Sequence, residues 1–279
     1  MIRVILSGRT GNNFFQYAAG RSLAIQRQTQ LILDGAWMDN THATQYEHLR
    51  RLPIAAAYER RLSASKRGLR KAFQLGPKHL HQGTYYRELQ PDYDPSFSQL
   101  PETTILDGYF QSPRYFAEIE PQLRQELNLQ AIQIPDKSRI FEDGLHSRTF
   151  VSIHLRRGDY LTLPNTQCLT PGYHEAAINY FRERWNSLCF CIFSDDIPWC
   201  RKQFDGPEFL FCDLPGSATD PLHDMRLMSS CHHHIIANSS YSWWGAWLNP
   251  TYEKVVIAPT MWMKEMSSVT VLPESWIRI

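Results

Sequence analysis

Two adjacent arginines stand where a buried strand is expected to end. In the segment VSIHLRRGDY, the apolar run 151–155 is followed by Arg156, Arg157, Gly158 and Asp159. A guanidinium group donates paired hydrogen bonds to phosphate oxygens, so this strand end suits a doubly charged phosphate ligand. The alternative is a surface salt bridge to Asp159.

Two further polar clusters also follow apolar runs. The segment SDD, at 194–196, follows LCFCIF, and its carboxylates suit a metal or a nucleoside contact as well as a solvated helix start. The segment NSSYSWWGAW, at 238–247, follows HIIA. Its short hydroxyl side chains and backbone amides suit phosphate oxygens at a helix start, although serine there can also act only as an N-cap. The tryptophans at helical spacing in this segment favour a core position.

The elements that position these clusters alternate between strand and helix. Such alternation predicts a parallel sheet with right-handed crossovers, in which ligands bind beyond the carboxyl ends of the strands. We therefore expect the polar clusters to form one site. The expected strands are 150–155, 188–193, 208–212, 234–237 and 254–258, and the expected helices are 171–185, 198–204, 221–231 and 243–248.

The first half of the sequence opens as β-α-β. RVIL and LILD read as strands, and the segment 12–28 between them reads as a helix. A strand at 104–110 and a helical stretch at 114–127, broken or kinked at Pro121, follow further on. Residues 45–100 show no readable pattern. The polar stretch 135–148 is the expected hinge between two α/β domains, 1–140 and 141–279.

Composition excludes several classes of protein. The 279 residues carry 29 basic and 28 acidic side chains, which is unlike the basic excess of a nucleic-acid-binding protein. No apolar run is long enough for a transmembrane segment, and the short apolar start does not suit a signal peptide. The six cysteines show no CxxC and suit reduced, mostly buried thiols. We expect a cytoplasmic protein, with peripheral contact at the inner membrane as an alternative. The basic run 60–71 reads as a solvated helix face or a weak anionic contact.

Two segments imitate familiar sites. HHH at 232–234 suggests a metal, but neighbouring strand side chains point to opposite faces, and no partner is spaced for a tetrahedral site. GRTGNNFFQYAAGRSLA at 8–24 lacks the GxGxxG and GKS/T spacings of phosphate loops. Both patterns favour structural roles.

Taken together, these motifs are similar to those of a known family. The chain resembles bacterial α-1,2-fucosyltransferases, the inverting GDP-fucose-dependent enzymes of glycosyltransferase family 11. The resemblance covers most of the chain and rests on GNNFFQYAAGRSLA, LDGYFQSPRYF at 106–116, HLRRGDY, FSDD and the block 224–249. One departure is at Asn12-Asn13, where the family usually has Asn-Gln after the glycine.

The resemblance implies a GT-B-like α/β fold, in which two Rossmann-like domains face a cleft. The domain 1–140 would serve the acceptor side and 141–279 would bind the donor. The implied reaction moves L-fucose from GDP-β-L-fucose to the 2-hydroxyl of a galactose-terminated oligosaccharide, with inversion. A related GDP-sugar transferase acting on another hydroxyl, and a catalytically silent nucleotide- or glycan-binding protein, are the alternatives. No cofactor and no metal are expected.

The expected site residues follow from the same motifs. Arg156 would stabilise charge on the β-phosphate, with support from Arg157. Asp159 would be the base or would orient the arginines, and Asp195 would contact guanine or ribose. The other expected donor contacts are Asn12, His154, Asn238, Ser239 and Ser240.

Overall fold

The chain is described by a computed structural model. The description covers residues 1–35, 47–59, 85–134, 144, 147–163, 166, 168–213, 220–264, 266–267 and 269–279. The chain divides into two compact units, Met1–Asn128 and Leu129–Ile279. The expected boundary at 140/141, most of the expected hinge 135–148 and the basic run 60–71 lie outside the described residues.

The described part of unit 1 contains a five-stranded sheet in which every pair of neighbours is parallel. The strand order is β3-β2-β1-β5-β4, so the chain runs outward from β1 on one side and returns on the other. Strands β1 and β2 confirm the expected β-α-β start. The strands are β1 (Ile2–Ile5), β2 (Leu31–Asp34), β3 (Ala57–Glu59), β4 (Tyr85–Arg87) and β5 (Ile105–Asp107).

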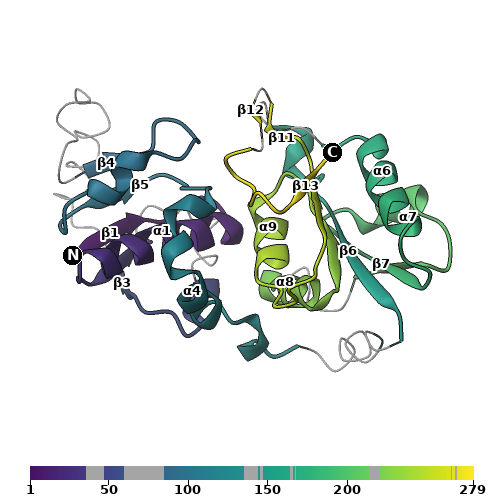
Figure 1. The fold of residues 1–279 in the computed structure, drawn as a ribbon, viewed down its shortest axis with the longest axis horizontal. Helices are drawn as coiled ribbons and strands as arrows, with labels where there is room; N and C mark the ends of the chain where they lie inside the picture. Colours follow the sequence, from purple (N-terminus) through teal and green to yellow (C-terminus); the bar gives the residue numbers. More distant parts are fainter. Residues whose placement is uncertain are drawn as a thin grey trace. The chain divides into compact units, whose positions relative to one another are not determined.

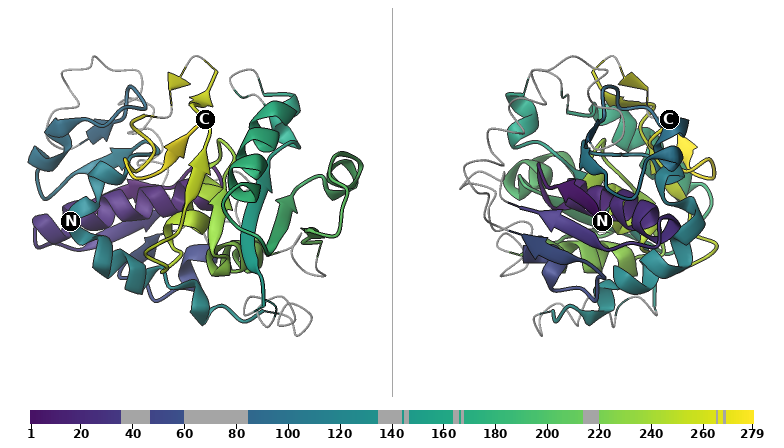
Figure 2. Two further views of the ribbon diagram at one scale, coloured as in Figure 1. Left: turned by 45° about the vertical axis from the view of Figure 1, so that its right-hand side comes forward. Right: turned by 90° about the vertical axis from the view of Figure 1, so that its left-hand side faces the viewer.

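Helix α1 (Thr10–Gln26) is buried over most of its circumference and covers one face of this sheet (Figure 1 and Figure 2). The expected helical stretch 114–127 is interrupted, because Pro121 lies in the first turn of α4 (Glu120–Glu126). Proline is tolerated there since its missing N–H would have no helical partner. Among the described residues of unit 1, the other helical elements are α2 (Glu47–Arg50) and the 3₁₀ turns Pro95–Gln99, Pro113–Tyr115 and Ala117–Ile119.

Unit 2 is built on a second parallel sheet, with the strand order β13-β10-β9-β6-β7-β8 among the residues described. Its alternation of strands and helices confirms the expected α/β class. The strands are β6 (Thr149–Leu155), β7 (Leu188–Ser194), β8 (Phe209–Phe211), β9 (His233–Ile235), β10 (Val256–Ala258) and β13 (Ile277–Arg278). The helices are α6 (Pro171–Arg182), α7 (Ile197–Gln203), α8 (Pro221–Ser230) and α9 (Ser240–Trp247).

Helices cover both faces of this sheet, which explains why its strands read as continuous apolar runs. On one face, Val151 and Ile153 of β6 belong to a core cluster with Phe181 of α6. On the other face, Phe150 and Cys191 pack with Met228 of α8. Figure 1 shows α6 and α7 on one side of β6 and β7, with α8 and α9 on the opposite side.

Several short elements carry no readable sequence pattern. Strands β3, β4 and β13 are at sheet edges and span only two or three residues, too few for a periodicity. A small antiparallel pair, β11 (Met261–Met263) and β12 (Met266–Ser267), lies near the C-terminus. Within the described ranges, no helix has the length and apolar character needed to span a membrane.

Candidate active site

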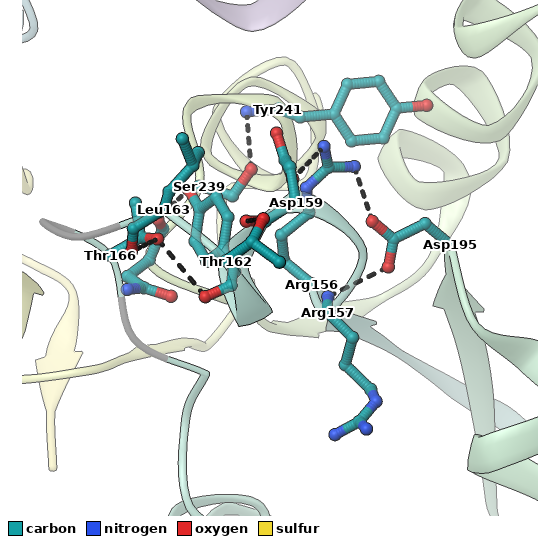
Figure 3. A network of polar contacts seen from close by, with 11 residues as sticks. Arg156, Arg157, Asp159, Thr162, Leu163, Thr166, Asp195, Ser239 and Tyr241 are labelled. Atoms are coloured by element: carbon teal, nitrogen blue, oxygen red, sulfur yellow. Dashed lines mark hydrogen bonds and ion pairs between the residues drawn. The ribbon is translucent and has the colours of Figure 1, made fainter.

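The three polar clusters follow strands that are neighbours in the sheet of unit 2. Strand β6 pairs in parallel with β7 on one side and with β9 on the other. The loops after these strands therefore leave the sheet at the same edge, as expected. The side chains of Arg156, Asp159 and Asp195 meet there, next to Ser239 and Tyr241 at the start of α9 (Figure 3).

Arg156 lies between two carboxylates. Its Nη2 donates to Oδ1 of Asp159 at 2.6 Å, and its Nη1 lies 2.9 Å from Oδ2 of Asp195. The Arg156 side chain is 17% exposed, so its remaining surface can reach a ligand at the sheet edge. Two ion pairs fix the direction of a planar guanidinium group before any ligand arrives. The expected ion pair with Asp159 is thus present, but it is part of a larger network.

Arg157 points away from Arg156 (Figure 3). Its Nε donates to Oδ2 of Asp196 at 3.1 Å, and its guanidinium carbon lies 3.8 Å from the centre of the Trp199 ring. Its backbone N–H donates to Oδ1 of Asp195 at 2.9 Å. The two guanidinium groups are therefore not side by side, which differs from the expectation that Arg157 supports Arg156 on one phosphate group.

Gly158 permits the close approach of Asp195. A Cβ atom built on Gly158 would lie 2.7 Å from Oδ2 of Asp195, which is closer than real contacts allow. Any side chain at 158 would therefore push away the carboxylate that holds Arg156.

The third cluster forms the beginning of α9. Ser239 is the N-cap residue, and its Oγ accepts from the backbone N–H of Tyr241 at 3.4 Å. Asn238 is buried, and its carbonyl oxygen accepts from the Tyr160 hydroxyl at 2.9 Å, which ties the loop after β9 to the loop after β6. Ser240, the first residue of the helix, is partly exposed. The amides of this helix start can receive an anion in addition to the local cap.

The sequence of residues 61–279 matches the family model described as glycosyl transferase family 11. The chain belongs to this family. Its Arg156 network is therefore the candidate active site of a glycosyltransferase.

Two relatives match over nearly the whole chain, and a third matches over about half of it. An α-1,2-colitosyltransferase of Escherichia coli is 33% identical over 98% of this chain and 97% of its own length. The O-antigen biosynthesis glycosyltransferase WbnK of Escherichia coli is 27% identical over 98% of this chain and 99% of its own. The galactoside 2-α-L-fucosyltransferase SEC1 of Bos taurus is 31% identical over 53% of this chain and 42% of its own.

Among solved structures, the E. coli ADP-heptose LPS heptosyltransferase II aligns with a TM-score of 0.50. The alignment covers 100% of this chain and 89% of the heptosyltransferase, at 12% identity. At this identity the similarity concerns the fold alone, and it confirms the expected GT-B-like class for this family 11 glycosyltransferase.

His154 of the glycosyltransferase is buried beside Tyr241. It is 5% exposed, and the two ring centres are 5.6 Å apart. Burial, helped by the charge of Arg156, lowers the pKa of His154 to about 3. The imidazole is therefore neutral near pH 7, and its Nδ1 is buried without a hydrogen-bond partner in the described part of the chain. It can serve a ligand as a neutral hydrogen-bonding group but not as a cation.

The three consecutive histidines have separate structural roles. The Nδ1 atoms of His232 and His233 accept from the backbone N–H groups of Phe150 and Val255, both at 3.0 Å. His234 is fully buried, with Nδ1 2.8 Å from Ser152 Oγ and Nε2 2.8 Å from Asn249 Nδ2. Each ring is thus engaged at a different place, as the strand alternation predicted.

Asn12 lies on α1 in unit 1. Its Oδ1 accepts from Nε2 of Gln111 at 2.7 Å. Its neighbour Asn13, where the family usually has glutamine, is fully buried, and its Nδ2 donates to the Ser7 carbonyl at 3.0 Å. Asn13 therefore holds the loop after β1, while the expected donor contact of Asn12 stays a prediction.

Sequence reasoning passed over Asp224, which opens the block 224–249. Burial, and secondly the charge of Asp220, raises the pKa of Asp224 to about 7. Its Oδ1 is buried with no hydrogen-bond partner among the residues described. Its charge is also one of the causes that raise the pKa of Tyr241, which places it near the start of α9. The signal available in the sequence was an acidic residue at a helical position inside this specific motif.

Proposed function

We propose that this glycosyltransferase moves L-fucose from GDP-β-L-fucose to the 2-hydroxyl of a terminal β-galactoside, giving an α-1,2 linkage. The observation that carries the proposal is the position of Arg156. It forms ion pairs with Asp159 and Asp195 at the sheet edge where β6, β7 and β9 have their carboxyl ends. Membership of family 11 and the relatives named for α-1,2 transfer support it.

In this reaction, the 2-hydroxyl oxygen attacks C1 of the fucose from the side opposite to GDP and releases its proton to water. The bond between C1 and the phosphate oxygen breaks, and its electron pair stays on the β-phosphate. A guanidinium group that is already oriented stabilises this developing charge without having to reorganise. Arg156 is fixed in this way by Asp159 and Asp195, so we assign it to the β-phosphate.

Asp159 then takes the second of its two expected roles. Its Oδ1 is 2.6 Å from Nη2 of Arg156, which makes it a positioning residue for the guanidinium group. Asp195 acts in the same manner, because one of its oxygens faces Arg156 and the other accepts from the Arg157 backbone. We therefore propose that Asp195 orients Arg156 and the loop after β6, instead of contacting the nucleoside.

The nucleotide would lie against the start of α9. Asn238, Ser239 and Ser240 supply backbone amides and hydroxyl groups for phosphate oxygens. His154 would contribute a neutral imidazole from the floor of the site. Asp224, a buried carboxyl with one oxygen that has no hydrogen-bond partner among the residues described, is the candidate to bind the polar edge of the guanine base.

No metal is required in this proposal. Asp195 and Asp196 are each held by an arginine, so the charge that a metal would balance is balanced by the chain itself. Turnover should persist in excess EDTA. Loss of turnover that Mg²⁺ or Mn²⁺ restores would show that the carboxylates at 195 and 196 serve a metal instead.

Colitosyl transfer is the second candidate, because a full-length relative at 33% identity carries that name. Colitose is L-fucose without its 3-hydroxyl group. A site that hydrogen-bonds this hydroxyl rejects the deoxy sugar strongly, whereas a site that leaves it in water discriminates little. The choice between the two donors thus depends on one hydrogen-bonding group.

The test is an incubation of the full chain with GDP-fucose or GDP-colitose and a set of β-galactosides. GDP release should depend on the acceptor, and NMR of the product should show an α-linkage at the galactose 2-position. A linkage at another hydroxyl would indicate a different GDP-sugar transferase. GDP binding without any turnover would indicate the silent binding protein.

A further inference from the structure

The turn after β5 in unit 1 presents an exposed aromatic ring on a rigid support. Tyr109 is 43% exposed, whereas the ring of the next residue, Phe110, is fully buried. Phe110 has a φ of 54°, a left-handed conformation that non-glycine residues rarely adopt. Its ring packs against Phe97 and Tyr115, with both pairs of ring centres 5.6 Å apart. The buried ring thus holds the unusual backbone that turns Tyr109 outward.

Glu88 fixes the same turn from the end of β4. Its Oε2 accepts from the backbone N–H of Tyr109 at 2.7 Å, and its Oε1 accepts from that of Phe110 at 3.1 Å. A carboxylate that accepts hydrogen bonds from two consecutive backbone N–H groups fixes the direction of the chain between those residues. Strain that is held by surrounding structure in this way is found at ligand-binding positions more than elsewhere.

The turn is also tied to α1 and lies beside the loop after β1. Gln16 Nε2 donates to the Gly108 carbonyl at 2.8 Å, and Gln111 Nε2 donates to Asn12 Oδ1 at 2.7 Å. Gly8 has a φ of 70°, and a Cβ atom there would lie 3.1 Å from Cε1 of Tyr109. The Tyr109 ring therefore lies directly beside the Gly8 backbone, with the Asn12–Gln111 amide pair next to it.

This place is the topological switch point of unit 1. Strands β1 and β5 are neighbours, but the chain continues from β1 toward β2 and reaches β5 from β4 on the opposite side. In parallel sheets, the crevice at the carboxyl ends of two such strands is the usual ligand site. None of the donor contacts assigned to unit 2 uses it.

The groups at this edge match a sugar. Amide side chains both donate and accept hydrogen bonds, as the hydroxyl groups of a pyranose do. An exposed aromatic ring offers an apolar face to the C–H groups on one side of a galactose ring. We propose that Tyr109, together with Asn12 and Gln111, binds the terminal galactose of the acceptor, and that Glu88 is the positioning residue for Tyr109. For Asn12, this acceptor role is proposed in place of the donor contact expected from the sequence. This inference rests on the proposed transferase function.

The experiment compares the KM for a β-galactoside acceptor with the KM for GDP-fucose in single variants of the full chain. Tyr109→Ala should raise the acceptor KM about tenfold, the effect of losing one aromatic contact, with little change in the donor KM. Tyr109→Phe keeps the aromatic ring, so the acceptor KM of this variant should stay within about twofold of the wild-type value. The matched control is Tyr252→Ala, since Tyr252 is 99% exposed on unit 2 and should show wild-type values.

Glu88 is tested through Tyr109. Glu88→Gln should raise the acceptor KM in the wild-type background and add little in the Tyr109→Ala background, because both changes remove the same placed ring. Additive effects of the two changes would overturn the positioning role. A wild-type acceptor KM in Tyr109→Ala would overturn the acceptor site and leave fucosyl transfer intact. Absence of transfer by the wild-type chain to any galactoside would overturn the proposed function as well.

Discussion

Asp195 connects Arg156 to the backbone of the residue that follows it. Its Oδ2 lies 2.9 Å from Nη1 of Arg156, and its Oδ1 accepts from the backbone N–H of Arg157 at 2.9 Å. Strand β7, which precedes Asp195, runs beside β6, which precedes the arginines. One carboxylate thus fixes both the guanidinium group that we assign to the phosphate and the loop that carries it.

Replacement of Asp195 by asparagine should therefore impair chemistry more than folding. We expect kcat to fall by about 10²-fold, because the guanidinium group loses one of its two fixed partners and its preorganisation. Steady-state kinetics with GDP-fucose and a galactoside give the measurement. The matched control is Asp196→Asn. Asparagine keeps a side-chain oxygen that can accept from the Trp199 backbone N–H, so this change removes only the charged partner of Arg157. Equal losses in the two variants would show that Asp195 has no special relation to Arg156.

Lysine at position 156 should not replace arginine. An ammonium group keeps the charge but cannot face two carboxylates and a phosphate with a planar fork, so we expect a loss of about 10²- to 10³-fold in kcat. Arg157→Lys should lose less, since that side chain is directed toward Asp196 and Trp199. Wild-type turnover in Arg156→Lys would contradict the assigned role, provided that thermal unfolding shows both variants folded.

GDP should stabilise the chain in the absence of acceptor. A ligand present at one hundred times its Kd adds about 2.7 kcal/mol to the free energy of unfolding. In a thermal-shift titration, GDP should raise Tm more than ADP or UDP. The sequence placed Asp195 at guanine or ribose, but its carboxylate is bound to Arg156 and to the Arg157 backbone. We therefore expect Asp195→Ala to reduce the Tm shifts with GDP and with ADP alike.

The selectivity for guanine should instead respond to Asp224→Asn. Equal Tm shifts for GDP, ADP and UDP in the wild-type chain would refute guanine selectivity. No shift with any nucleotide would count against the donor site as a whole.

Asp224 should also make the stability of the chain depend on pH. The pKa of its carboxyl is about 7 in the folded chain and 3.8 in the reference state, so between these values only the folded state keeps the proton. The contribution of Asp224 to the free energy of unfolding should therefore fall as the pH rises from about 4 to about 7, by at most about 4 kcal/mol, and stay level above that. Buried histidines with lowered pKa, such as His154, contribute with the opposite sign, so the effect of Asp224 is the difference between the wild-type chain and Asp224→Asn at each pH. Urea unfolding at pH 5 and pH 8 provides the measurement, and the exposed Glu253→Gln variant should keep the wild-type difference.

The sequence predicted the elements of unit 2 well because they are long or strongly patterned. Strands β6 and β7 are seven residues long and mostly apolar, and α6 begins with proline and has apolar residues at helical spacing. Helix α1, between β1 and β2, was predicted for the same reason, because it is 17 residues long. Strands of two or three residues, such as β3, β4 and β13, exist only because a neighbouring strand offers hydrogen bonds, and a local pattern cannot reveal that.

The sequence alone also determined that Arg156, Asp195 and Asn238 would come together, because parallel strands deliver their carboxyl ends to one edge. Only the tertiary structure decided what each side chain does there. It paired Arg156 with Asp195 across two strands and turned Arg157 toward Trp199. It also buried Asp224 with one oxygen that has no hydrogen-bond partner in the part of the chain that the structure describes. The direction of a side chain and the dielectric around it depend on residues from distant parts of the chain, so spacing within a motif does not contain them.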